Sequence, residues 1–244
     1  MKRLISLRDR DIDKPFDMRS EFARGTGPMI WSLTNHTVEL ARTVVDLSAA
    51  DRMVVALPLI RLCMENAMTA AWLLISPRAV DATVHEGMCQ RRAAIRDLLD
   101  QGIEGFDADS MAAAESAVGE FAQGKSPEGQ HIDRRFKAMK GGAKMYVSYR
   151  VASSLSHAGM TLGDFYLEEV PVSLAAPAGL AFMPNKKMDS HEAWVGTAAS
   201  MLVVAMTACD RTDSKRSQKN QLVKAAATLQ IDTDFQLVDP PSVV

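Results

Sequence analysis

The sequence predicts an all-α protein, an antiparallel helical bundle of about seven helices with at most one small β-hairpin near residues 165–183. Two properties of its 244 residues predict this class. Apolar residues make up 47% but aromatic residues only 6%, while alanine is abundant and 15 residues are Met. Ala and Met favour helices, whereas sheets favour β-branched and aromatic residues. The loops between the helical segments are short, which is typical of antiparallel neighbours in a bundle.

Glycine and proline divide the chain into its elements. Ser76-Pro77, Gln101-Gly102, Gly141-Gly142 and Gly159 end helices, and Ser48, Asp109 and Asp189 or Ser190 are suited to cap the starts of helices. Pro58 marks either a kink or the start of its helix. The expected helices cover residues 29–47, 48–75, 79–99, 109–123, 133–139, 144–157 and 190–210, and a last short helix starts at Ser214 or Ser217 and runs to 229. Segments 165–170 and 180–183 are bounded by Gly and Pro and predict the hairpin.

Three parts are expected along the chain. Residues 1–27 are charged and end in a Gly- and Pro-containing stretch, so we expect a loose N-terminal arm. Residues 28–230 form a single helical domain, which is long enough to bury a large core without disulfides or metals. Residues 231–244 contain Pro240-Pro241 and are expected to form a flexible C-terminal tail.

Two apolar runs, 54–75 and 193–209, predict the helices at the centre of the core. The first contains Arg61 and Glu65, each of which costs about 2.5–3.5 kcal/mol at the centre of a bilayer. The second is rich in Ala, Gly and Thr and reaches only the short limit for spanning a membrane. We therefore expect no membrane partner. The charged start and the three separated cysteines predict a cytoplasmic protein with free thiols.

Two local motifs match known patterns by letter only. Residues 119–126 match the phosphate-loop pattern GxxxxGK[ST], but that loop needs a strand before it and a helix after it. An Ala-rich helix precedes it here and Pro127 follows, so we expect a helix end and a loop. His85 and Cys89 are four residues apart and could share a metal, but the sequence shows no second pair of ligands. We expect neither a metal nor a cofactor.

One predicted helix carries several polar side chains that can take part in catalysis or binding. On a wheel of about 100° per residue, five polar side chains of segment 144–157 fall within an arc of about 100°. They are Tyr146, Tyr149, Arg150, Ser153 and His157. The adjacent face is apolar and comprises Val147, Val151, Leu155 and Ala158. A solvated helix face more often carries Lys and Glu, so this face indicates a polar network or a site.

Arg61 and Glu65 stand four residues apart in a helix that is otherwise almost wholly apolar. A lone charge there is costly, so the two side chains are expected to pair with each other and with a third polar group. The face from Tyr149 to His157 is the natural candidate. We therefore expect the two helices to pack together, with Glu65 within hydrogen-bond reach of Arg61 or of that face.

The segment from Pro58 to Ala67 resembles the Arg-x3-Glu helix of an uncharacterised bacterial helical family. The segment from Tyr149 to His157 resembles that family's Tyr-x3-Ser-x3-His helix. The family is similar in turn to the HEPN superfamily, all-α proteins that include metal-independent ribonucleases of toxin and antiphage systems. Their signature is an Arg followed after four to six residues by a His, which Arg150 and His157 fit at the longest spacing. Val151 and Ala158 depart from the residues usual in active members.

This resemblance implies His157 as a general acid or base and Arg150 as the cation that stabilises the phosphorane. Arg61, Glu65, Tyr146, Tyr149 and Ser153 would support them. It also implies a homodimer, RNA as substrate, and an antitoxin or another protein as partner. Seven basic residues could guide a phosphate backbone or simply form solvated faces: Arg91, Arg92, Arg96, Arg134, Arg135, Lys137 and Lys140.

A non-catalytic interpretation remains open beside the ribonuclease. In that alternative, the chain is a helical binding module for a partner protein or a small ligand, and the polar network only stabilises its core. Solvent access to His157 separates the two. A nuclease needs the imidazole open to its substrate, whereas a core network needs it enclosed.

Overall fold

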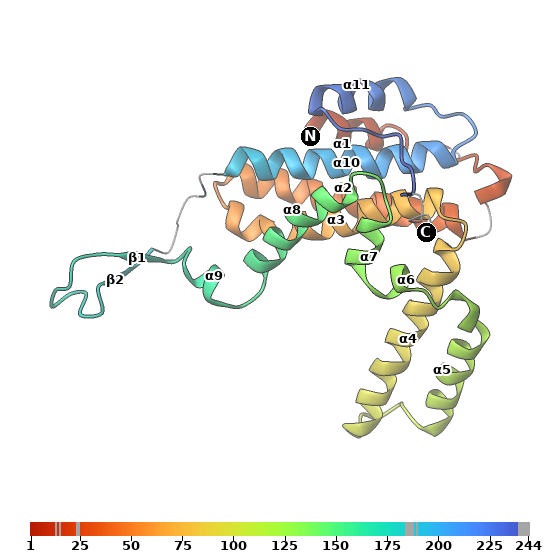
Figure 1. The fold of residues 1–244 in the computed structure, drawn as a ribbon, viewed down its shortest axis with the longest axis horizontal. Coiled ribbons are helices and arrows are strands. Elements are labelled where there is room, and N and C mark those ends of the chain that lie inside the picture. Colours follow the sequence, from red (N-terminus) through yellow and green to blue (C-terminus); the bar gives the residue numbers. More distant parts are fainter. Residues whose placement is uncertain (13, 15, 23–24, 184–187, 189, 239–244) are drawn as a thin grey trace, which may run out of the picture.

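The computed structural model describes residues 1–12, 14, 16–22, 25–183, 188 and 190–238. It is 69% helical, with eleven α-helices and one two-stranded hairpin, which confirms the predicted all-α class (Figure 1). The helices are α1 (Lys2–Asp9), α2 (Thr26–Ala49), α3 (Met53–Ile75), α4 (Ala79–Asp100), α5 (Ala108–Glu120), α6 (Pro127–Gln130), α7 (Ile132–Lys137), α8 (Gly142–Ser156), α9 (Met160–Gly163), α10 (His191–Thr212) and α11 (Lys219–Leu229). The strands are β1 (Leu167–Glu169) and β2 (Leu180–Phe182).

Three long helices, α2, α3 and α10, form the centre of the molecule (Figure 1). The two apolar runs of the sequence lie in α3 and α10, whose buried residues dominate the core, as predicted. Both helices are long and apolar enough to cross a membrane by length and composition. In each, 67% of the most apolar window is buried inside the structure. This degree of burial is also that of core helices in folded proteins.

The expectation of a loose arm over residues 1–27 is wrong for much of that segment. Helix α1 buries Leu4, Ile5 and Leu7 in a second apolar cluster with residues of α2, α10 and α11. Further along, the backbone N–H of Arg19 donates to the carbonyl of Thr212 at 2.9 Å. An eight-residue helix is marginal by itself. Its apolar pattern is too short to predict a helix, and docking on the bundle stabilises it.

The expected flexible tail is also ordered in its first part. Leu237 forms an antiparallel bridge with Met139, and the N–H of Lys140 donates to the carbonyl of Gln236 at 2.9 Å. These bonds hold residues 236–238 against the segment that follows α7. They connect segments about a hundred residues apart, so no local pattern could predict them. The remainder of the expected tail, 239–244, lies outside the described residues.

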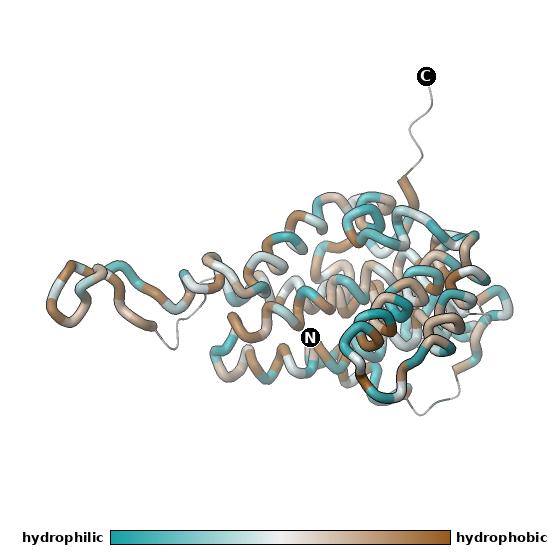
Figure 2. Tube along the Cα trace, turned by 90° about the horizontal axis from the view of Figure 1, so that it is seen from below, coloured by the Kyte–Doolittle hydropathy of each residue, from teal (hydrophilic) through white to brown (hydrophobic). Residues whose placement is uncertain are grey.

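Two hairpins project from the central body (Figure 1). One is helical and consists of α4 and α5. The other is the β1–β2 hairpin, which confirms the predicted β structure and pairs Leu167 with Phe182 in antiparallel register. Figure 2 shows the β-hairpin extending from the body with hydrophobic segments along it, and Val172, Leu174 and Phe182 are exposed there.

Several expected helix ends differ from those observed. Ser48 does not cap the start of α3; it lies inside α2, and its hydroxyl bonds His191 Nε2 of α10 at 2.7 Å. Helix α3 starts at Met53, so Pro58 lies inside the helix and does not begin it. The cap of α5 is Asp107, two residues earlier than predicted, and its carboxylate accepts the N–H of Ser110 at 2.9 Å. Tertiary bonds and neighbouring Asp residues compete with the local cap signals here.

We expect Ile5→Ala to lower the free energy of unfolding by about 2–5 kcal/mol, because Ile5 is buried against the bundle. Chemical denaturation followed by circular dichroism measures this loss. Ser6→Ala is the matched control, since Ser6 is exposed on the same helix and its replacement should change stability by less than about 0.5 kcal/mol. Equal effects of the two changes would contradict the docking of α1.

The three free thiols should differ in reactivity. Burial raises the pKa of the Cys63 thiol to about 12 and that of Cys209 to about 11, which keeps both largely protonated at pH 8. Cys89 is only partly buried. Iodoacetamide should therefore modify Cys89 first in the folded protein and all three thiols in denaturant, as read by peptide mass mapping. Modification of Cys63 as fast as Cys89 would refute the buried position of α3.

Candidate functional site

Helices α3 and α8 pack side by side, as the sequence predicts. Glu65 lies at the centre of their polar contact. Its carboxylate accepts a hydrogen bond from the Tyr149 hydroxyl at 2.7 Å and pairs with Arg61 Nη2 at 2.9 Å. Arg61 completes the triangle, because its Nε and Nη2 donate to the Tyr149 oxygen at 3.4 and 3.3 Å. The expected partner of the Arg61–Glu65 pair is thus Tyr149.

The environment of this triangle adjusts the acid–base properties of its members. Burial, followed by the hydrogen bond to Glu65, raises the pKa of the Tyr149 phenol. Burial acts to lower the pKa of Arg61, but the Tyr149 hydroxyl and the charge of Glu65 outweigh it, so that pKa is raised. Both shifts keep Tyr149 protonated and Arg61 charged at neutral pH. The triangle is therefore a stable set of hydrogen-bond and ion-pair partners.

Aromatic packing holds the same contact. The Tyr149 ring stacks on that of Tyr146 with centroids 5.8 Å apart, and Phe136 of α7 lies 5.4 Å from Tyr149. The guanidinium of Arg61 lies 5.6 Å from the centre of the Tyr149 ring. Tyr146 and Tyr149, both predicted to support a site, therefore fix α8 against α3 and α7.

The structure separates Arg150 and His157 from this network. Both side chains are exposed, and neither makes a hydrogen bond or an ion pair with the residues that the structure describes. Ser153, between them, is half-buried. The expected helix 144–157 ends at Ser156, and His157 follows in an extended conformation with φ −94° and ψ 145°. His157 therefore occupies the end of α8, where the chain turns towards the β-hairpin.

The predicted apolar face of α8 does not form its buried face. Only Leu155 of its four residues is buried, while Val147 and Val151 are 62% and 45% exposed. The buried face instead carries Tyr149, Ala152 and Leu155. The bond of Tyr149 to Glu65 turns that residue towards α3, and residues three and six positions later follow it into the contact. The valines are consequently left on the outer surface beside Arg150.

The position of Arg135 in the structure differs most from the role that we expected of it from the sequence. The sequence groups it with the basic residues that could guide RNA, but it lies over the Trp72 ring at 4.9 Å. Its Nη1 donates to the Thr69 hydroxyl at 2.7 Å, and two further bonds reach backbone carbonyls. Burial lowers its pKa. No local signal distinguishes it from exposed Arg134, because the difference is set by the packing of α7 on α3.

Residues 119–126, which match the phosphate-loop pattern only by letter, form the helix end and the turn that the sequence predicts. Helix α5 ends at Glu120, a 3₁₀ turn spans Ala122–Gly124, and Ser126 caps the one-turn helix α6. A side chain at position 124 would bring its Cβ within 2.2 Å of the Asp81 carbonyl oxygen. Gly124 is therefore needed for close packing against α4. The loop expected after it differs only in that Pro127 starts a helical turn.

The described part of the chain contains no group of three or more His, Cys, Asp or Glu side chains that could hold a metal ion. Cys89 Sγ lies 3.8 Å from His85 Nε2, so these two side chains contact each other within α4.

No family model matches the chain, and no curated protein or solved structure does either. The geometry of α3 and α8 is what bears on its function.

Tyr149→Phe tests the triangle. The change deletes the hydroxyl that links Glu65 and Arg61, and we expect it to lower the free energy of unfolding by about 1–2 kcal/mol. Urea denaturation measures the loss. Tyr146→Phe is the matched control, because the Tyr146 ring packs in the same stack but its hydroxyl makes no hydrogen bond to a described residue. An equal loss in both variants would show that the triangle contributes nothing specific.

Proposed function

We propose that this chain is a HEPN-like protein of host-defence or toxin type that cleaves RNA without a metal ion. Its site would be formed by Arg150 and His157 of two copies. One observation carries the proposal: both side chains are exposed and unbonded within the described structure, while their neighbour Tyr149 is held in the core. A core network would enclose them, whereas a nuclease needs them open.

The two residue types suit the chemistry of RNA cleavage. The 2′ oxygen attacks phosphorus, its proton passes to a base, and an acid protonates the 5′ oxygen that leaves. An imidazole exchanges protons near neutral pH, so His157 can serve as that base or acid. A guanidinium carries a permanent charge and planar donors, so Arg150 can stabilise the phosphorane oxygens.

One chain alone is poorly arranged for this task. Arg150 and His157 are seven residues apart, about 10 Å along a helix axis. A helical side chain leans towards the N-terminus, so Arg150 extends away from His157 by default. A two-fold axis near Ser153 would bring the Arg150 of one copy towards the His157 of the other. The exposed Val147 and Val151 beside Arg150 supply apolar surface for such a contact.

The triangle of Arg61, Glu65 and Tyr149 lies on the buried side of α8 and stabilises the helix that carries the proposed site. It anchors the middle of α8 on α3 and so determines which side chains of α8 reach the surface. The exposed basic residues Arg91, Arg96 and Arg134 could attract a phosphate backbone. A protein of this class would act in the cytoplasm, with an antitoxin or another protein as its partner.

A second candidate function is a non-catalytic helical binding module. The half-buried triangle favours it, since a network of this kind stabilises a core without any chemistry. In that case the exposed face of α8 would bind a partner protein, and Arg150 would contribute charge only.

Complementation between inactive chains tests the catalytic proposal. We expect Arg150→Ala and His157→Ala each to lower RNA cleavage by about 100-fold or more, measured on labelled single-stranded RNA with EDTA present. When the two variants are refolded together in equal amounts, half of the dimers are mixed, and each has one intact site. Cleavage should therefore return to about a quarter of the wild-type rate.

Lys144→Ala is the control, because Lys144 is an exposed cation on the same helix and should leave the rate unchanged. Failure of the mixture to recover activity would contradict a shared site. If wild type never cleaves RNA, or if both single variants match it, the catalytic proposal is wrong. The binding-module function would then be the one to pursue.

A further inference from the structure

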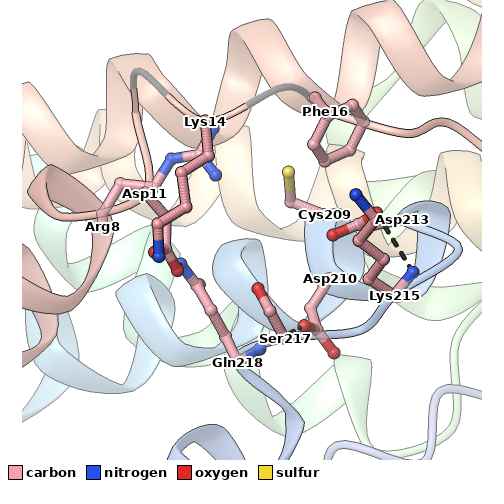
Figure 3. Close-up of a pocket in the computed structure, with 10 residues that line it drawn as sticks. All are labelled: Arg8, Asp11, Lys14, Phe16, Cys209, Asp210, Asp213, Lys215, Ser217 and Gln218. Carbon is pink, nitrogen blue, oxygen red and sulfur yellow. Dashed lines mark hydrogen bonds and ion pairs between the residues drawn. The ribbon is translucent and has the colours of Figure 1, made fainter.

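A separate pocket lies between α1, the segment that follows it and the end of α10 (Figure 3). It has a volume of about 200 Å³ and does not include Arg150 or His157, so its binding chemistry is independent of the proposed function. Phe16 and Cys209 form apolar parts of its wall. The charged lining residues are Arg8, Asp11, Lys14, Asp210, Asp213 and Lys215.

Arg8 is the unusual member of this lining. Only 6% of its surface is exposed, although its side chain carries a permanent charge. Its Nε donates to Asn35 Oδ1 at 2.9 Å, and its guanidinium lies 5.8 Å from the centre of the Trp31 ring. Neither terminal nitrogen donates to a described residue, and Nη2 is shielded from solvent. In Figure 3 the side chain extends from α1 towards the interior of the pocket.

The carboxylates of the pocket are bonded elsewhere. Asp11 pairs with Lys14 and accepts Gln218 Nε2 at 2.8 Å. Asp210 accepts the backbone N–H of Gln218 at 2.9 Å, and its other oxygen lies 3.4 Å from Arg216 Nε.

The third carboxylate, Asp213, accepts the N–H of Lys215 at 3.2 Å. Arg8 thus has no carboxylate partner among the described residues. A buried charge is strongly unfavourable without a counter-charge, so an anion from outside the chain would be bound tightly here.

We infer that this pocket binds a small organic monocarboxylate, with Arg8 as the residue that receives the carboxylate. A guanidinium presents parallel N–H donors that match the two oxygens of a carboxylate. The three aspartates of the lining disfavour a dianion such as phosphate more than a monoanion. The apolar surfaces of Phe16 and Cys209 suit a short hydrocarbon body.

Lys14 lines the pocket together with Arg8. Because Arg8 Nη2 is shielded, a carboxylate reaches both terminal nitrogens only after a lining side chain moves. The Lys14 side chain is 65% exposed and is held by an ion pair to Asp11, an interaction that is weak at a surface. Lys14 can therefore move aside at little cost, and its charge would then add to that of Arg8.

Calorimetric titration of the full chain with sodium butyrate tests the inference. Butyrate should bind saturably, one molecule per chain, whereas butyramide, its neutral isostere, and inorganic phosphate should bind at least about tenfold more weakly. Arg8→Met should weaken butyrate binding by at least about tenfold, and Arg8→Lys should recover part of it. Arg3→Met is the matched control, because Arg3 is an exposed cation of α1 outside this pocket, and it should bind butyrate like wild type.

A second measurement needs no variant. A nuclear Overhauser effect between the butyrate methyl group and the Phe16 ring should appear in the wild-type protein, and it decides the outcome if Arg8→Met does not fold. Equal binding of butyrate and butyramide, unchanged binding in Arg8→Met, no binding of butyrate at millimolar concentration, or no contact with Phe16 would each overturn the inference.

Discussion

The arrangement of this protein depends on how one apolar helix accommodates two charges. Helix α3 is one of the two strongly apolar helices of the core, yet Arg61 and Glu65 lie in its middle. Their mutual ion pair leaves lone pairs and N–H groups that still need partners. The Tyr149 hydroxyl satisfies both, as donor to Glu65 and acceptor from Arg61. This requirement places α8 against α3 at a definite rotation.

The chemistry available at the surface follows from that rotation. With Tyr149 turned inward, Arg150 must face outward, because adjacent helical residues point about 100° apart. Val147 and Val151 are exposed on the same side. The helix then ends at Ser156, and His157 lies at the junction with the projecting hairpin. A structural network and a potential surface site are therefore two consequences of one contact, and do not exclude each other.

The N-terminal helix illustrates the opposite situation, in which packing creates an unsatisfied group. Docking of α1 buries Leu4, Ile5 and Leu7, and the burial of these side chains stabilises the bundle. The same docking encloses Arg8, which gains an amide oxygen and an aromatic face but no carboxylate. The apolar gain of the helix outweighs the cost of one incompletely paired guanidinium, and that guanidinium is what gives the neighbouring pocket its affinity for an anion.

The sequence alone determined the helical class, the two core helices, the position of the β-hairpin and the partnership of Arg61 and Glu65 with the helix of Tyr149. Each depends on local periodicity, on Gly and Pro, or on the cost of burying charge. Only the tertiary structure decided that α1 is docked, that Arg135 packs over Trp72 and that Val147 and Val151 are exposed. These outcomes depend on which face of a short helix meets a distant neighbour. A short segment has several faces of similar hydrophobicity, so contacts far away in the sequence select among them.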